Sequence, residues 1–246
     1  MQHAERPDVD EVLAADHNWY HVVELAPGVT TSGFIDLRAH VDGAGLPADL
    51  SGLRALDVGT FDGFWAFELE KRGAQVIGID VDQIPPPDTP RDRWAAVQQE
   101  LAGKVTGTGF ALLKSYFGSS VDRRSLNVYD LTADKIDGPV DLAFIGAMLL
   151  HLRDPVGALE AVRSVLEPGG RLVLFEPVDR QLSRKKEPLA RFLQGHTIWT
   201  WWLPNAACLR DWVTTAGFTD LTEHGHRDVA DSTGRRQRLL ALHARA

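Results

Sequence analysis

The stretch Ala55–Trp65, ALDVGTFDGFW, indicates a strand, a glycine turn and the start of a helix. The apolar residues around Asp57 are typical of a buried strand, and Gly59 and Gly63 let a ligand approach the backbone beside a helix N-terminus. A pyrophosphate cofactor requires the pattern G-x-G-x-x-G, but Phe61 stands where the second glycine is needed. The turn therefore favours a nucleoside cofactor without a phosphate over a nicotinamide dinucleotide.

Predicted strands and helices alternate on both sides of this stretch. This alternation predicts an α/β fold with a Rossmann-like, doubly wound sheet that is mostly parallel and ends in an antiparallel C-terminal strand. Ligands of such sheets bind beyond the carboxyl ends of the strands. Strands are expected at 54–58, 74–80, 125–129, 141–145, 171–176, 219–224 and 237–243, and helices at 64–72, 155–166 and 206–216, with one or two helical pieces within 94–117.

Three segments are distinguished along the chain. Residues 1–50 are irregular and are predicted to form an N-terminal lid over the ligand. Residues 51–246 form the expected cofactor-binding domain, within which 177–204 is an insertion that shapes an acceptor pocket. This insertion carries a tryptophan cluster, IWTWWLPN, at 198–205. Tryptophans supply large apolar area with one polar edge, so an aromatic or hydrophobic acceptor is expected.

Composition excludes several functional classes. The chain has 246 residues, enough for one sizeable core, and a net charge of −8, which disfavours a broad nucleic-acid-binding surface. The single cysteine, Cys208, fits a reducing compartment. The polar N-terminus is unlike a signal peptide, and no apolar run approaches the roughly 20 residues of a membrane span. A cytoplasmic protein is expected, without a metal site; the sequence leaves monomer and homodimer open.

Two acidic residues near predicted strand ends add to the cofactor prediction. Asp80 ends the second strand about twenty residues after the glycine turn, where a carboxylate can accept both hydroxyls of a ribose. Asp130 follows the third predicted strand and can accept the exocyclic amine of adenine, while Tyr129 can cover the ring. The alternative for Asp130 is a helix cap or a turn residue. Together these residues favour S-adenosyl-L-methionine as the cofactor.

Five segments in order resemble the class I S-adenosylmethionine-dependent methyltransferases. These are D-V-G-x-F-D-G at 57–63, I-G-I-D at 77–80, V-Y-D-L at 128–131, the stretch from D-L-A-F-I-G-A-M to H-L-R-D-P at 141–155, and L-E-P-G-G-R-L-V-L at 166–174. The resemblance implies a role for each segment. The methionine tail and ribose would be surrounded by Asp57, Gly59, Phe61 and Gly63. The ribose would be held and the adenine flanked by Asp80, Val81 and Asp82, and the adenine would be met by Tyr129, Asp130 and Leu131. A wall beside the sulfonium would be formed by Gly146, Ala147 and Met148.

A narrower resemblance is to the methyltransferase of tRNA wobble-uridine modification and its bacterial relatives. It includes the pattern W-Y-H-x-x-x-L-x-x-G-V-x-T-x-G at 19–33 and the segment from the tryptophan cluster to Gly217. That enzyme uses a carboxylated cofactor, which implies a cationic residue in the segment before the core. Residues 19–31 hold no Lys or Arg, only His21. Ordinary S-adenosylmethionine and a small-molecule acceptor are therefore favoured, and a tRNA acceptor is the alternative.

The chemistry of methyl transfer asks the protein to align the acceptor, to exclude water and, for a hydroxyl or an ammonium, to supply a base. O-, N- and C-methylation all remain open. His151, after the fourth strand, and His21, in the expected lid, are the candidate bases, and each has a purely structural alternative. The candidate acceptor-binding residues are Trp19, Tyr20, Glu176, Trp199 and Trp202; for Glu176 and for the tryptophan cluster a structural role is the alternative.

Overall fold

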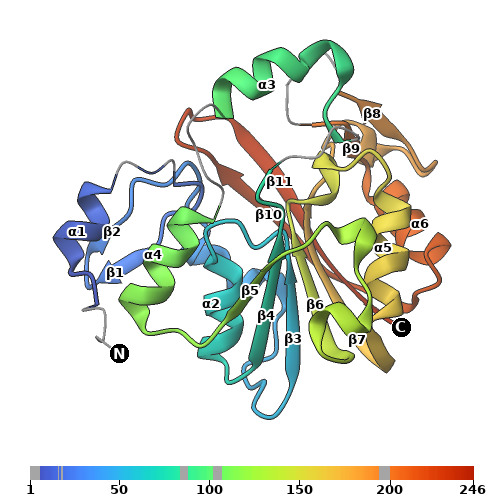
Figure 1. Ribbon diagram of the computed structural model, residues 1–246. Coiled ribbons are helices and arrows are strands. Elements are labelled where there is room, and N and C mark those ends of the chain that lie inside the picture. The colour runs from blue at the N-terminus through green and yellow to red at the C-terminus, as the bar shows by residue number, and fades with distance from the viewer. Residues whose placement is uncertain (1–5, 16, 18, 84–87, 102–106, 194–199) are drawn as a thin grey trace.

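The computed structural model describes residues 6–15, 17, 19–83, 88–101, 107–193 and 200–246, and its centre is a seven-stranded sheet (Figure 1). The strand order is β10-β11-β7-β6-β3-β4-β5. All neighbouring pairs from β7 to β5 are parallel, and β11 pairs antiparallel with both β7 and β10. The predicted doubly wound sheet is thereby confirmed. Its strands are β3 (Arg54–Val58), β4 (Gln75–Asp80), β5 (Asp122–Ser125), β6 (Val140–Gly146), β7 (Leu166–Pro177), β10 (Thr219–Ala230) and β11 (Arg236–Arg245).

Helices cover both faces of this sheet. Figure 1 shows α2 and α4 on one side, α5 and α6 on the other, and α3 above the sheet in that view. Local sequence defines the helix starts: Asp154 accepts the amide of Gly157 ahead of α5, and Asn205 accepts the amide of Cys208 ahead of α6. The helices are α2 (Phe64–Lys71), α3 (Trp94–Leu101), α4 (Thr108–Phe117), α5 (Pro155–Ser164) and α6 (Ala206–Thr215).

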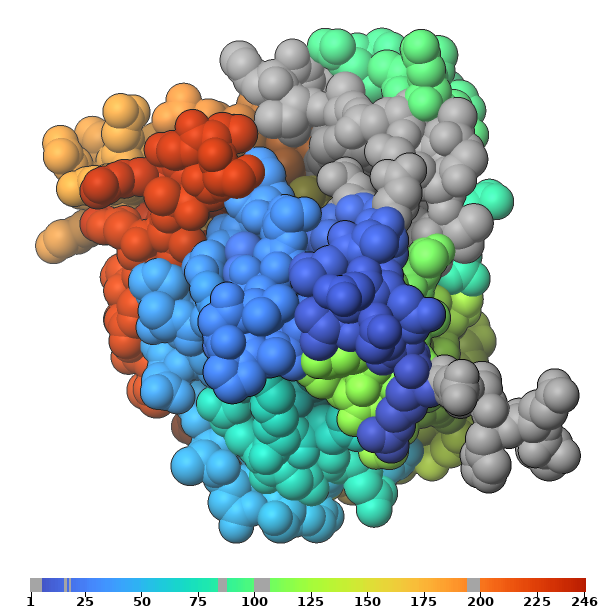
Figure 2. Space-filling model, turned by 90° about the vertical axis from the view of Figure 1, so that its left-hand side faces the viewer, coloured from blue at the N-terminus to red at the C-terminus, as the bar shows by residue number. Residues whose placement is uncertain are grey.

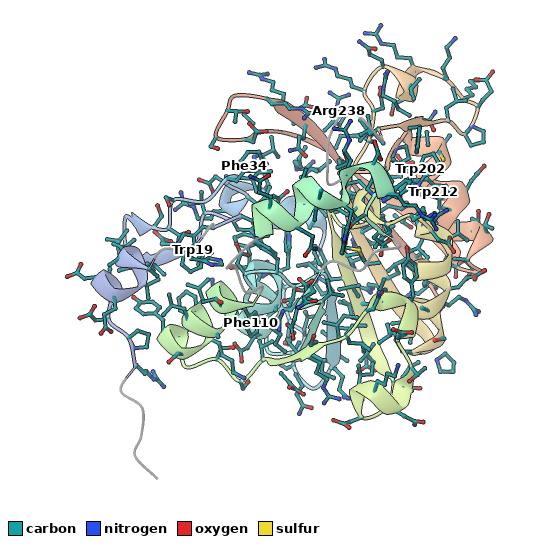
Figure 3. The ribbon with its side chains drawn as sticks, turned by 45° about the horizontal axis from the view of Figure 1, so that its top comes forward. Trp19, Phe34, Phe110, Trp202, Trp212 and Arg238 are labelled. Atoms are coloured by element: carbon teal, nitrogen blue, oxygen red, sulfur yellow. The ribbon has the colours of Figure 1, made fainter. Side chains whose placement is uncertain are left out.

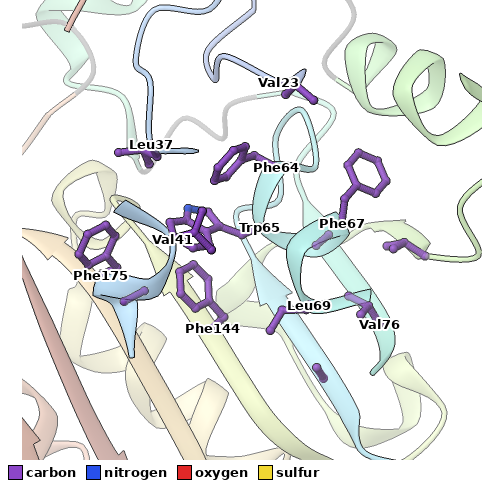
Figure 4. Close-up of a cluster of buried hydrophobic side chains, with 14 of the residues drawn as sticks. Val23, Leu37, Val41, Phe64, Trp65, Phe67, Leu69, Val76, Phe144 and Phe175 are labelled. Carbon is purple, nitrogen blue, oxygen red and sulfur yellow. The ribbon is translucent and has the colours of Figure 1, made fainter. Parts of the chain in front are cut away.

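Alternating side chains of the strands form two apolar cores, one on each face. Phe144 and Leu142 of β6 point to the face covered by α2, where they join Trp65, while Ala143 and Ile145 join the core beneath α5 and α6. Trp65 lies at the centre of the first core, with its ring centroid 4.4 Å from that of Phe144 (Figure 4). This alternation is the period-two pattern expected of strands buried on both faces.

The N-terminal residues are part of the first core. They form α1 (Val9–Ala14), β1 (Glu24–Ala26), β2 (Val29–Thr30) and the 3₁₀ turns η1 (Arg38–His40) and η2 (Asp42–Ala44). Val12, Leu25 and Val41 are buried in the core of α2. Figure 2 shows this segment, in blue, covering one face of the molecule between the C-terminal hairpin and α4. The predicted lid is therefore packed against the domain over much of its length.

The remaining elements lie at the carboxyl edge of the sheet or connect its layers. The short strands β8 (Ala190–Phe192) and β9 (Trp202–Pro204) form an antiparallel hairpin within the predicted insertion. No helix within the described ranges is long and apolar enough to cross a membrane. The short turns are η4 (Arg91–Arg93), η5 (Val128–Asp130), η6 (Ala133–Ile136), η7 (Leu149–His151) and η8 (Leu182–Arg184).

The predicted third strand at 125–129 is wrong. The observed strand β5 covers Asp122–Ser125, and the following residues form the 3₁₀ turn η5. Pairing with β4 ends where Asp80 meets Ser125, and the Asn127 side chain then accepts the amide of Tyr129 to start the turn. The sequence of β5, DRRS, lacks apolar residues because it is an edge strand, so hydrophobic patterning did not identify it.

Shortening Phe144 to alanine should destabilise the protein strongly. This ring is fully buried and contacts Trp65, so Phe144→Ala leaves a cavity and is expected to lower the free energy of unfolding by about 3–5 kcal/mol. Urea denaturation measures the change. The matched control is Phe192→Ala, because Phe192 is 50% exposed and its loss should cost less than about 1 kcal/mol. Equal losses in the two variants would contradict this description of the core.

Candidate functional site

The glycine turn after β3 is held by the carboxylate of Asp80. One oxygen accepts the amide of Phe61 at 2.7 Å, and the other accepts the amide of Val81 at 2.7 Å. Phe61 has φ 42°, the left-handed conformation that normally favours glycine. The hydrogen bond to Asp80 fixes this conformation, so a phenylalanine occupies the position of the missing second glycine. Its ring is 37% exposed, which places it on the surface of the turn and not beneath it.

Beneath this turn lies a buried carboxylate with an unused oxygen. The Oδ2 atom of Asp57 and the hydroxyl of Thr60 are fully buried and make no hydrogen bond of normal geometry in the part of the chain that the structure describes, although the nearby Thr60 side chain lowers the pKa of the Asp57 carboxyl against the larger effect of burial. Burial raises the pKa of Asp57 to about 7. An unsatisfied buried acceptor is costly, and a cationic partner would remove that cost. The position therefore suits an ammonium group such as that of a methionine tail.

Glu176 holds the loop that follows β6. Its Oε1 atom accepts the amides of Met148 at 2.8 Å and Leu149 at 3.2 Å, next to Ala147, whose φ is 50°. Burial raises the pKa of Glu176 to about 8. Acceptor binding and a structural role are the two sequence-based predictions for Glu176, and these hydrogen bonds give it the structural role of shaping the wall beside the glycine turn.

That wall contacts the turn directly. A Cβ atom at Gly59 would come within 2.7 Å of Cγ of Met148. Gly59 also has φ 77°, so both its conformation and its surroundings require glycine. Gly146 ends β6 against Trp65 and Phe144, which likewise leave no room for a side chain. The predicted turn and wall are thus brought together at the carboxyl ends of β3 and β6.

His21 and Asp62 form a buried pair over the turn. Nδ1 of His21 lies 2.6 Å from Oδ1 of Asp62, and Oδ2 of the same carboxylate accepts the amides of His21 at 2.8 Å and Tyr20 at 3.2 Å. The imidazole stacks on Phe64, with ring centroids 4.9 Å apart. Burial would raise the pKa of Asp62, but the charge and hydrogen bonds of His21 outweigh it and lower that pKa. Sequence reasoning missed Asp62, because its partner is 41 residues away.

Tyr20 lies between the turn and the C-terminal strands. Its ring meets that of Phe61 edge-on, with centroids 6.0 Å apart. Burial and then the charges of Asp62, Glu176 and Asp231 raise the pKa of Tyr20 to about 12. Tyr20 thus stays protonated at neutral pH, as a hydroxyl that can donate a hydrogen bond. Tyr20 therefore lies beside the turn, and its part in binding the acceptor stays a prediction.

The residues predicted to bind adenine lie around the ends of β4 and β5. Tyr129 donates its hydroxyl to Asp88 at 3.1 Å and accepts the amide of Asp154 at 3.0 Å, so it also ties two loops together. Asp130 is exposed in η5, whose cap is Asn127 and not Asp130. Leu131 is buried, and Asp82 pairs with Arg123 at 3.1 Å.

The predicted acceptor residues do not form one cluster. Trp19 is only 5% exposed, packs in the first core and meets His17 edge-on, so its indole has a packing role and the acceptor assignment is corrected. Trp202 donates its indole N–H to the carbonyl of Arg153. Figure 3 shows Trp19 and Trp202 on opposite sides of the molecule. Trp199 lies outside the described residues.

His151 lies next to the wall. It ends η7, is partly buried, and its amide donates to the carbonyl of Met148 at 3.0 Å. The neighbouring Trp201, which donates its indole N–H to the carbonyl of Asp88 at 2.8 Å, fixes the hairpin of the insertion over this loop. His151 therefore keeps a position from which it can face the acceptor, and its role as a base stays a prediction.

Comparison with known proteins assigns the class. Residues 37–223 match the family model described as a methyltransferase domain, so the chain belongs to that family. The predictions of a methyltransferase fold and of S-adenosyl-L-methionine as its cofactor are confirmed.

Individual relatives differ in what they act on. The chain is 33% identical to a tRNA U34 carboxymethyltransferase of Pseudomonas paraeruginosa over 70% of this chain and 47% of that protein, and 31% identical to the one of Azotobacter vinelandii with the same coverage. The chain thus spans about half the length of these curated relatives. In fold it is similar to the [4+2]-cyclase SpnF, with TM-score 0.57, 20% identity and coverage of 96% and 90%. It is likewise similar to the N-terminal domain of EvdMO1 crystallised in the presence of SAH and D-fucose, with TM-score 0.58, 17% identity and coverage of 97% and 94%.

Replacing Glu176 by glutamine should change how stability depends on pH. The pKa of Glu176 is raised to about 8 in the folded protein, so the unfolded chain releases this proton at lower pH than the folded protein does. The folded protein therefore loses stability as the pH rises from the ordinary pKa of a glutamate to about 8. Glu176→Gln keeps an oxygen for the two amides and removes the proton equilibrium. Between roughly pH 6 and pH 8, where this carboxyl ionises in the folded protein, the free energy of unfolding of the wild type should fall by about 1–3 kcal/mol more than that of the variant.

Urea denaturation at several pH values, without cofactor, measures this difference. The control is Glu167→Gln, because Glu167 is an exposed carboxyl on the same strand, β7. Parallel pH profiles for the wild type and Glu176→Gln would show that the carboxyl is already ionised in the folded protein.

Proposed function

We propose that this protein transfers a methyl group from S-adenosyl-L-methionine to a small-molecule acceptor. The observation that carries the proposal is the unpartnered, buried Oδ2 atom of Asp57 beneath the glycine turn, because it needs a cationic ligand group. Asp80 supports the same cofactor, since its carboxylate stands at the end of β4 in the position that binds ribose hydroxyls in such sheets. Membership of the methyltransferase-domain family makes methyl transfer the reaction.

The residues of this chain bind the cofactor, orient the acceptor and enclose the reacting centre. Asp57 holds the ammonium of the methionine tail, Asp80 the ribose, and Met148 closes the wall beside the reacting centre. The bound cofactor supplies an activated methyl group, so the protein needs mainly to align the acceptor and exclude water. Tyr20 contributes to that enclosure from the N-terminal segment, and Trp202 borders the acceptor side on the insertion.

The acidic surroundings favour an uncharged or cationic acceptor. Asp57, Asp62 and Glu176 are all buried around the turn. Asp62 stays ionised because its pKa is lowered, and a nearby negative charge repels an anionic ligand. A small neutral molecule is therefore the better match, and oxygen, nitrogen and carbon acceptors are all compatible with the bound cofactor.

Removing the carboxylate of Asp80 should weaken cofactor binding. Asp80→Ala loses both the ribose acceptor and the hydrogen bond that fixes Phe61, so the dissociation constant for S-adenosylhomocysteine should rise by about tenfold or more. Isothermal titration calorimetry measures it, with NAD as the comparison ligand. Asp122→Ala is the control, because this exposed aspartate starts β5 beside Ile77, before the carboxyl end of β4, and the variant should bind like the wild type. NAD binding without S-adenosylhomocysteine binding would refute the cofactor assignment.

The second candidate acceptor is tRNA. Relatives of 33% and 31% identity are named tRNA U34 carboxymethyltransferase, and these names are the observation that favours a tRNA acceptor. Against it stand the net charge of −8 and the acidic surroundings of the turn.

Binding to tRNA distinguishes the two candidates. We expect fluorescence anisotropy with total tRNA to show at most weak binding, with no steep dependence on salt. A tRNA enzyme would bind with a dissociation constant that rises by orders of magnitude between about 50 and 200 mM salt. The control is a tRNA of scrambled anticodon loop, because a wobble-base enzyme would prefer the natural sequence. Salt-sensitive, anticodon-dependent binding would reverse the ranking of acceptors.

A further inference from the structure

The structure places a histidine–carboxylate pair beside the cofactor turn, on two segments far apart in the sequence. His21 comes from the N-terminal segment, and Asp62 from the glycine turn itself. Three hydrogen bonds join them: the imidazole contact of 2.6 Å and the two amides of His21 and Tyr20 that donate to the second carboxylate oxygen. Both oxygens of Asp62 are thus used by the N-terminal segment.

This arrangement fixes the orientation of the imidazole. Because Asp62 stays ionised, it accepts the proton of Nδ1, and Nε2 is the nitrogen that remains to exchange a proton. Stacking on Phe64 and the edge-on contact with Tyr20 hold the ring plane. No residue in the described ranges hydrogen-bonds to Nε2, and the side chain keeps 9% exposure. A carboxylate that orients a histidine through Nδ1 leaves Nε2 to act as the base.

We propose that His21 is the general base of the methyl transfer, that Asp62 positions it, and that the acceptor is a hydroxyl. The inference rests on the proposed methyltransferase function and names its acceptor class. A hydroxyl must lose its proton as it attacks, whereas a neutral amine attacks with its lone pair and needs no base for that step. In the reaction the acceptor oxygen forms a bond to the methyl carbon, the carbon–sulfur bond breaks with its electron pair left on sulfur, and the hydroxyl proton passes to Nε2 of His21.

The charged and titratable groups around the imidazole agree with this role. Asp62 binds it, Asp57 feels its charge from beneath the turn, and Tyr20 meets its edge. His17 lies on the same segment, where the charge of Asp62 acts on it as well. The surroundings are therefore acidic, which stabilises the imidazolium that forms when the base takes a proton.

The test compares Asp62→Asn and His21→Gln with the wild type. We measure S-adenosylhomocysteine binding by calorimetry, and methyl transfer from methyl-labelled cofactor to a monosaccharide and phenol panel and to the corresponding amines. We expect methylated hydroxyl products from the wild type, a kcat lower by about 10²-fold or more in both variants, and cofactor affinity within about threefold of the wild type.

Chemical rescue and the pH profile separate a catalytic from a structural role. Added imidazole should partly restore kcat in His21→Gln, because it supplies the missing base. The pH profile of kcat in Asp62→Asn and in His21→Gln should differ from that of the wild type. The control is His40→Gln, a change of another histidine of the N-terminal segment, in η1, which should leave both kcat and the profile unchanged.

Several outcomes would overturn the inference while leaving the proposed function intact. One is a fall in S-adenosylhomocysteine affinity that matches the fall in kcat, because His21 would then hold the cofactor. Another is methylation of amines only, with full activity in His21→Gln. A wild type that binds S-adenosylhomocysteine but transfers no methyl group to any hydroxyl of the panel also contradicts it. A wild type that binds no S-adenosylhomocysteine refutes the proposed function itself.

Discussion

The carboxylate of Asp80 at the end of β4 is the constraint on which the ligand-facing structure depends. Its two oxygens accept the amides of Phe61 and Val81, so it joins the end of one strand to the turn that follows its neighbour. This contact fixes Phe61 in a left-handed conformation, and the turn then presents Asp62 to the N-terminal segment while Asp57 stays beneath it. A side chain first considered for a ribose thus also shapes the backbone that would surround the cofactor.

The N-terminal segment is better described as part of the core than as a free lid. Ile35 forms bridges to His21 and to Asp231 near the C-terminal hairpin, and Val23 and Leu37 pack near Phe64 (Figure 4). Because Ile35 ties the segment of His21 to Asp231, between β10 and β11, the backbone of His21 and Tyr20 is fixed before any ligand binds. Such preorganisation is what a general base needs, since a residue that must first be ordered contributes less to the rate.

The buried carboxyl groups around the turn have pKa values that are shifted in opposite directions. Asp57 and Glu176 have raised pKa values because they are removed from water, whereas Asp62 keeps a lowered pKa because His21 faces it. Neighbouring acids with opposite shifts therefore have different roles: Asp57 awaits a cation, Glu176 orders a loop through backbone amides, and Asp62 remains a charged partner. Groups with strongly shifted pKa values concentrate at functional sites for this reason.

The sequence by itself determined the sheet class, the glycine turn, the helices that begin at 155 and 206, and the cofactor, because each depends on contacts between residues close in the chain or on a strand-by-strand pattern. It failed at β5, where an edge strand has no apolar alternation, and at Trp19, whose burial depends on distant packing. Only the tertiary structure decided that Asp62 meets His21 and that Glu176 binds the amides of Met148 and Leu149. These contacts join residues 27 to 41 positions apart, and no local pattern specifies which polar groups will share a buried space after the strands assemble.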